Sequence, residues 1–142
     1  MDQLEEIRQT LEAAVGLNEV LAAAYAGFLV MMPVIEDQQD PASPHFAAFV
    51  MAGATAASGR LALIAAPSLP DASRSADFAD SALCGRDAED IASLLAELCQ
   101  LMACRLYEAA LAAMDADDRE ACSRASHHAR HLGALFGGDP AR

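Results

Sequence analysis

Three of the four histidines in this 142-residue sequence lie close together, at His127, His128 and His131. Residues four apart share one face of a helix, so His127 and His131 can bind the same divalent metal ion, such as zinc or nickel. His45, which stands where a separate helix is expected to begin, can supply a third ligand. The same histidines are also typical of a solvated helix end, where they interact favourably with the helix dipole. The residues alone leave both interpretations open.

The segment from His127 to Gly133 has two histidines four apart and a glycine two positions after the second. This pattern resembles a late segment of the DinB-like superfamily. Members are four-helix bundles in which one histidine of the second helix and two of the fourth bind a divalent metal. Some are thiol-dependent transferases or isomerases. The resemblance implies that His45, His127 and His131 are metal ligands; apart from this metal, no cofactor is expected.

A second set of polar residues falls on or near faces that are otherwise apolar: Asn18, Tyr25, Arg60 and Arg105. An arginine on such a face needs a carboxylate or an anionic ligand, because an unpaired buried charge is costly. One interpretation is a polar pocket inside the helical bundle that uses these four residues to bind a small anionic ligand. The other is an internal ion-pair network that fixes the helix register, for which Glu108 is one available partner. No catalytic group is indicated, so whether the protein is an enzyme stays open.

Composition narrows the class of protein. The chain is 54% hydrophobic with a formal net charge of −12, which argues against disorder and against nucleic-acid binding. Its 34 alanines favour helices that approach one another closely. The N-terminus is acidic, the longest apolar run is interrupted by Gly27 and Pro33, and the four cysteines form no CxxC pair. We therefore expect a cytoplasmic protein with reduced thiols, one domain over residues 1–142 and no membrane partner.

Hydrophobic periodicity and capping residues predict an all-α fold, a four-helix bundle with a long crossover between the second and third helices. Asp87 is the expected cap of the third helix. No glycine or proline separates the last two helices, so two helices or one bent helix are both open. The expected helices are 3–32, 44–66, 87–114 and 116–136, with a short helix over 75–83.

The second predicted helix has an apolar stripe formed by Phe46, Phe49, Val50, Gly53, Ala57, Leu61 and Ile64. Other large apolar residues fall off the main stripes: Leu17, Leu21, Phe28, Met31, Met51 and Leu111. A helix that is apolar on several faces is buried on several faces, so we expect a homodimer formed through helices 3–32 and 44–66.

The expected function is that of a small acidic homodimeric module that binds a ligand or a protein partner. Two alternatives remain. One is a DinB-like metal-dependent transferase or isomerase, and the other is a small metal-free enzyme with an arginine-containing pocket.

Overall fold

A computed structural model describes residues 3–74 and 87–137, and in those ranges the chain is helical with no strand. The all-α prediction is therefore confirmed. Five of the six helices are substantial, and the remaining one, α4, has four residues. The helices are α1 (Gln3–Ala13), α2 (Leu17–Asp37), α3 (Phe46–Ile64), α4 (Asp71–Arg74), α5 (Ala88–Ala112) and α6 (Ala116–Leu135).

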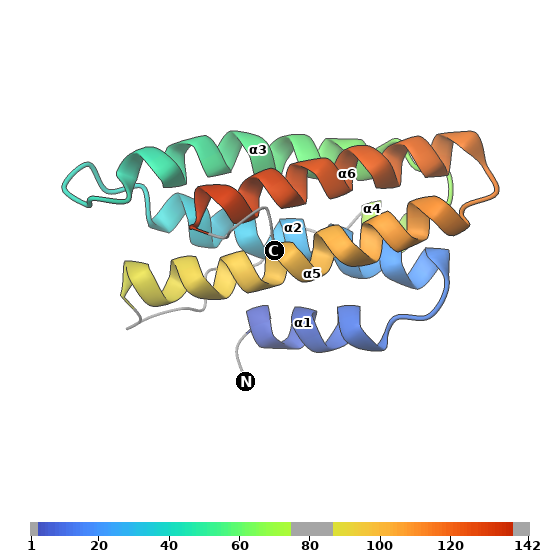
Figure 1. The fold of residues 1–142 in the computed structure, drawn as a ribbon, viewed down its shortest axis with the longest axis horizontal. Coiled ribbons are helices and arrows are strands. Elements are labelled where there is room, and N and C mark those ends of the chain that lie inside the picture. Colours follow the sequence, from blue (N-terminus) through green and yellow to red (C-terminus); the bar gives the residue numbers. More distant parts are fainter. Residues whose placement is uncertain (1–2, 75–86, 138–142) are drawn as a thin grey trace.

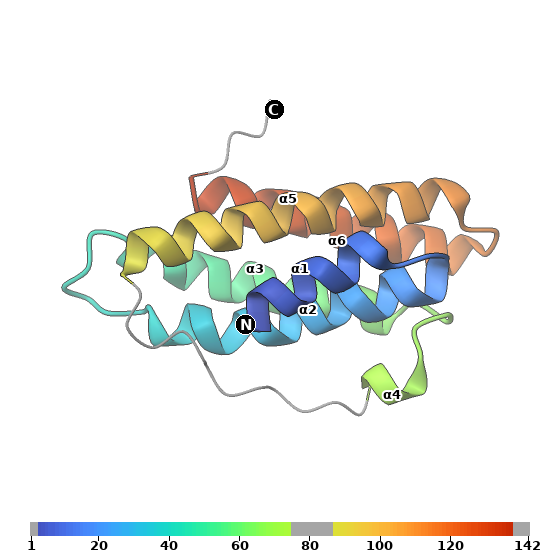
Figure 2. The same ribbon diagram turned by 90° about the horizontal axis from the view of Figure 1, so that it is seen from below.

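The long helices lie side by side (Figure 1). α2, α3, α6 and α5 follow one another around the core, each antiparallel to the next, and α1 packs on both α2 and α5. In the view of Figure 2, α1 lies in front of these two helices. Because α3 and α5 run in the same direction, residues 65–87 connect opposite ends of the molecule. The short helix predicted over 75–83 lies outside the described residues.

The single helix predicted over 3–32 is wrong, because the chain forms two antiparallel helices there. Gly16 has a φ of 87°, a conformation that ends a helix and that other residues rarely adopt. Val15, expected on the buried stripe, is consequently 75% exposed in the turn. The later of these two helices, α2, also continues through Pro33, whereas the predicted helix ended at residue 32. Val34 and Ile35 are buried in the core, and this burial offsets the free-energy cost of the backbone hydrogen bond that the proline cannot donate.

Side-chain caps define the starts of α5 and α6. Asp87 accepts a hydrogen bond from the backbone N–H of Asp90 at 2.8 Å, as the sequence predicts. Asp115 accepts from the N–H groups of Asp117 and Asp118 at 2.8 and 3.1 Å. α5 and α6 are therefore separate helices, which answers the question that the sequence left open.

α2 occupies the centre of the arrangement and is buried on several faces. Leu21, Phe28 and Met31, which fall off the predicted stripe, are fully buried because α1, α3 and α5 all contact this helix. Neighbouring helices of the same chain thus explain these residues without a second copy. Met51 and Leu111, by contrast, are 54% and 71% exposed.

The predicted stripe of the helix at 44–66 is partly wrong. Val50 and Leu61 are 43% and 60% exposed, although the periodicity placed them on the inner face. α3 carries apolar or small residues all round and a single charge, Arg60, so its sequence gives little contrast between faces. The residues that it buries are Phe49, Ala52, Ala56, Gly59 and Leu63.

Two glycines differ in how closely another helix approaches them. A Cβ added at Gly59 would lie 2.5 Å from the ring of Phe28, so α2 presses its aromatic side chain directly onto the backbone of α3. A Cβ added at Gly133 would lie 3.6 Å from the Cβ of Cys99, which is ordinary van der Waals contact. Only the first glycine is required by packing.

Gly59→Ala should therefore destabilise the fold by about 1–3 kcal/mol, because the added methyl group forces the Phe28 ring to move within a filled core. Gly133→Ala is the matched control. It adds the same methyl group in the last turn of α6, where it should be neutral or stabilising by up to about 1 kcal/mol. Thermal unfolding followed by circular dichroism measures both, and equal losses of Tm in the two variants would contradict this account.

Candidate functional site

Arg105 joins α5 to the end of α1. Its Nε donates to the carbonyl of Leu11 at 3.1 Å, one terminal nitrogen donates to the carbonyl of Ala14, and the other donates to Glu108 at 3.2 Å. The last carbonyls of a helix have no partner within the helix. The guanidinium therefore serves the C-terminal end of α1, in line with the register-fixing interpretation.

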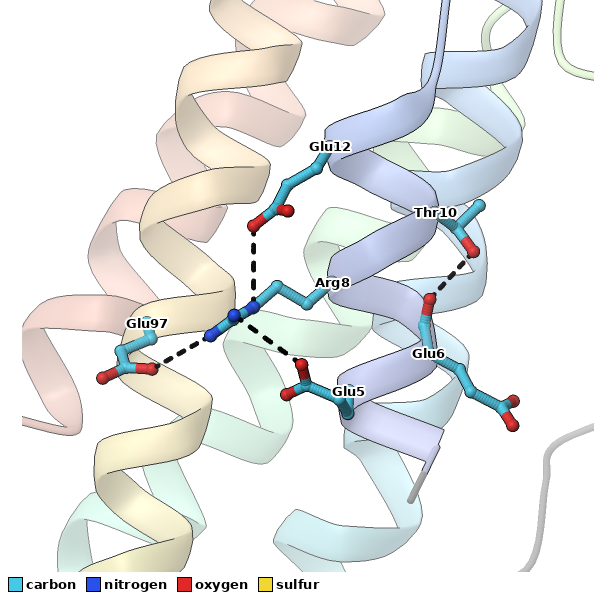
Figure 3. Close-up of polar contacts among 6 residues, drawn as sticks. All are labelled: Glu5, Glu6, Arg8, Thr10, Glu12 and Glu97. Atoms are coloured by element: carbon cyan, nitrogen blue, oxygen red, sulfur yellow. Dashed lines mark hydrogen bonds and ion pairs between the residues drawn. The ribbon is translucent and has the colours of Figure 1, made fainter. Parts of the chain in front are cut away.

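Arg8 makes a second link between α1 and α5 (Figure 3). Its guanidinium lies 3.6 Å from carboxylate oxygens of Glu5 and Glu12 on its own helix, and 3.8 Å from Glu97 on α5. All four side chains are substantially exposed, so each pair contributes little alone. Together with Arg105, the cluster orients α1 along α5.

The four predicted pocket residues are not brought together. Tyr25 and Arg60 meet between α2 and α3, with the guanidinium carbon 5.8 Å from the ring centroid. The Tyr25 side chain is buried, and its hydroxyl has no hydrogen-bond partner in the described part of the chain. Asn18 is exposed at the start of α2, and Arg105 is directed at α1. A ligand-binding role for these residues stays a prediction.

The three predicted metal ligands also lie apart. His45 precedes α3, packs edge-on against Phe49 at 6.5 Å, and lines a cavity of about 170 Å³. His127 and His131 line a different cavity, of about 300 Å³, together with His128. Within residues 3–74 and 87–137, no group of three or more His, Cys, Asp or Glu side chains is placed to hold a metal ion. The ligand set implied by the resemblance is thus not assembled.

A hollow in the described surface runs between α3 and α6. It consists of the cavity of about 300 Å³ and an adjoining one of about 490 Å³, which share Ser58 and His128. α3 contributes small and apolar side chains, and α6 contributes mostly polar and charged ones of both signs. The lining residues are Ala54, Thr55, Ser58, Leu61, Ala62, Ala65, Asp117, Glu120, Ala121, Arg124, His127, His128 and His131.

The outer side of α3 continues this hollow as an exposed apolar surface. Six of its exposed residues, spaced by three or four, form what we call the α3 seam; Val50, which is also exposed, is not part of it. The seam together with the groove wall of α6 is the α3–α6 face. Met51 and Leu61 are the large members of the seam, 54% and 60% exposed. The α3 seam comprises Ala47, Met51, Ala54, Ser58, Leu61 and Ala65.

The charge of the α3–α6 face differs from that of the whole chain. Although the protein has 21 acidic residues, none occurs in residues 41–70 or 121–138. The acids at the groove are confined to one end, where Glu120 pairs with Arg124 at 2.8 Å. Sequence reasoning implicated the helix at 44–66 in an interface but not α6, and the two acid-free stretches were a signal that could have pointed to both.

The cysteines in the described ranges do not offer a nucleophile in this groove. Burial, with a smaller contribution from the negative charge of Asp118, raises the pKa of the Cys122 thiol to about 11. Burial also raises the pKa of Cys99. Since the thiolate is the reactive form, both residues are held as unreactive thiols. Cys104 is exposed on α5, away from the groove.

Comparison with known proteins gave no match: no family model, curated protein or solved structure is significantly similar to the chain. The candidate site therefore depends on its geometry alone. That geometry offers one apolar helix beside a polar wall, and no assembled catalytic or metal constellation in the described ranges.

His128 should titrate below the ordinary histidine value of 6.5. Partial burial lowers its pKa most, and the charges of His127, His131 and Arg124 lower it further. A histidine with a lowered pKa binds fewer protons folded than unfolded. Its contribution to stability is therefore complete above pH 6.5 and declines as the pH falls through that value.

An NMR titration of the histidine ring protons measures this shift. His127→Gln should raise the pKa of His128, but not fully to the ordinary value, because the burial remains. Arg130→Gln on the exposed side of α6 should leave it unchanged. A His128 midpoint at or above the ordinary value in the unmodified protein would refute the assignment.

Arg105→Met should lower stability by about 1–3 kcal/mol, because it removes the donors to the carbonyls of Leu11 and Ala14. Hydrogen exchange should accelerate first in α1, whose end the guanidinium holds. Arg130→Met, an exposed arginine replaced by the same side chain, is the control and should change little. If Arg105→Met left Tm and α1 exchange unaltered, the arginine would not be fixing this helix.

Proposed function

We propose that this protein is a non-catalytic helical binding module and that its α3–α6 face receives an α-helix of a partner. On this view α2, α3, α6 and α5 form a four-helix bundle to which α1 is an added helix. The observation that supports this proposal is the exposed apolar surface of α3 beside a groove on the same side of the helix. Large exposed apolar surfaces on soluble proteins mark interaction sites.

The shape and chemistry of the face support a helix as occupant. A helix that lies in a groove buries a stripe of side chains spaced by three and four residues, and the α3 seam presents that spacing over the length of α3. The groove wall of α6 carries Arg124, paired with Glu120, and three histidines, with its acids confined to one end, so it does not repel a neutral partner.

Membrane insertion is the competing explanation for apolar helices of this length. α2 and α3 are both long and apolar enough to cross a membrane by length and composition. In α2, 61% of the apolar window is buried inside the protein, as expected for a core helix, whereas in α3 the value is 28%. For the exposed face of α3, an experiment therefore has to distinguish a partner helix from a lipid surface.

A labelled amphipathic peptide tests the proposal directly. The probe is a synthetic helix with leucine and alanine at its a and d positions and glutamate on its outer side, and fluorescence anisotropy measures its binding. Leu61→Glu should weaken binding by about tenfold or more, because it places a charge in the centre of the apolar seam. Leu111→Glu, at an equally exposed leucine of α5, should leave binding unchanged. Absence of peptide binding, or equal losses in both variants, would refute a helix-docking function for this face.

A further inference from the structure

A separate cavity lies at one end of the bundle, where α3 and α5 begin and α6 ends (Figure 1). Its volume is about 170 Å³, and residues of all three helices or their ends line it. None of these residues lines the groove between α3 and α6, so the cavity is distinct from the proposed docking face. The lining residues are His45, Ala48, Phe49, Ala92, Leu135, Phe136 and Gly137.

The inner wall of this cavity belongs to the core. Phe49, Ala92 and Phe136 are all buried. α3 and α5 are not neighbours around the core, and α5 presents only the short side chain of Ala92 to the cavity. A methyl group fills little volume, so space remains between it and the two phenylalanine rings. The other four lining residues are partly or fully exposed, and the cavity therefore opens to solvent on their side.

Aromatic rings form much of the wall. The ring centroids of Phe49 and Phe136 lie 5.5 Å apart with the rings tilted by 46°, and the imidazole of His45 meets Phe49 edge-on at 6.5 Å. Aromatic side chains favour offset and edge-to-face contacts with further rings at such distances. A planar aromatic guest therefore finds suitable contacts on two sides of the cavity.

The cavity offers few partners to water. Among the described residues of the lining, His45 is the one whose side chain carries hydrogen-bonding atoms. Its backbone N–H donates to the hydroxyl oxygen of Ser43 at 3.1 Å, while its ring nitrogens make no hydrogen bond within the described ranges. A bound water needs about two to four polar partners, whereas a ligand with one polar substituent needs a single one. The imidazole can supply it as donor or as acceptor.

The volume restricts the size of the guest. An apolar cavity of about 150 Å³ stays dry and binds benzene, whereas sites for drug-sized ligands measure about 300–1,000 Å³. The cavity beside Phe49 is thus large enough for one aromatic ring and too small for a nucleotide or another large cofactor.

The surrounding charge favours a neutral guest. α2 ends and α5 begins at the same end of the bundle as the cavity (Figure 1). These segments carry Glu36, Asp37, Asp87 and Asp90, and the whole chain has a net charge of −12. A negatively charged ligand would approach against this field, whereas an uncharged one would not.

We propose that this cavity binds a neutral molecule with a single aromatic ring and one hydrogen-bonding substituent, of the phenol class. The ring lies against Phe49 and Phe136, and the substituent is hydrogen-bonded to the imidazole of His45. This site is independent of the proposed helix-docking function, since the two share no lining residue.

An NMR titration of the full chain with phenol tests the site. Resonances of His45, Phe49 and Phe136 should shift and saturate, with a Kd of about 1 mM or lower. Toluene, which has the same size but no hydroxyl group, is the second probe. His45→Leu should weaken phenol binding by about fivefold and change toluene binding by less than about twofold, because one hydrogen bond is lost.

Filling the cavity is the complementary test. Ala92→Leu places a larger side chain in the open space and should weaken both probes by about tenfold or more. Ala48→Leu fills the same space from α3 and should have the same effect, so the result does not depend on one variant. Ala112→Leu, at an exposed alanine near the end of α5, should leave binding unchanged. Circular dichroism checks that each variant is folded.

Four outcomes would overturn the proposal. The first is the absence of saturable shifts at the three ring residues up to about 10 mM phenol. The second is undiminished binding in folded Ala92→Leu and Ala48→Leu variants. The third is an equal loss of phenol and toluene binding in His45→Leu, which would leave the imidazole without the stated role. The fourth is loss of phenol binding in Leu61→Glu, which would place the probe in the groove between α3 and α6 instead.

Discussion

The closing of helix C-terminal ends by arginines is the constraint on which this architecture depends. A helix leaves its last carbonyls without partners, and an arginine can satisfy several because its guanidinium carries five donors. Arg105 does this for α1 through Leu11 and Ala14. After α3, Arg74 donates to the carbonyls of Ala66 at 2.5 Å and Leu69 at 3.4 Å. After α5, Arg119 reaches the carbonyl of Ala113 at 3.3 Å. The ends of α1, α3 and α5 are therefore held by arginines, which come from α5 for α1 and from the helix that follows for α3 and α5.

This use of arginine changes how the interior is understood. Arg105 faces helix carbonyls and Glu108, and Arg60 lies over the ring of Tyr25, so neither lines a described cavity. The buried carboxylate of Asp118 likewise accepts from the backbone and hydroxyl of Ser68 at 2.9 and 2.6 Å, which fixes the segment after α3 to the start of α6. These polar side chains within the fold join helix ends to helices. What remains for recognition lies on the outside, along α3 and α6.

The sequence predicted what depends on local signals. Asp87 could be recognised as a cap because its side chain acts within one turn, and the stripe of α6 at Ala125, Ala129 and Leu132 is buried as its spacing indicates. The turn at Gly16 was missed because apolar spacing continues across it, and a glycine within such a pattern does not reveal its backbone angle. The inner face of α3 was misassigned for a different reason. Periodicity measures contrast between polar and apolar faces, and Leu61 and Leu63 are equivalent on that scale although only one is buried.

That lack of contrast is itself informative about α3. A surface helix of a monomer ordinarily carries charged residues outward, because these keep the protein soluble. Here the chain has ample acids and places them on α1, α2, α5 and the start of α6. The inward side of α3 needs small residues, since Gly59 admits the ring of Phe28. Nothing in the packing of α2 or α6 requires the outward side to be apolar as well. The apolar outward side of α3, which the packing of its own fold does not explain, is therefore the feature on which the proposed docking function rests.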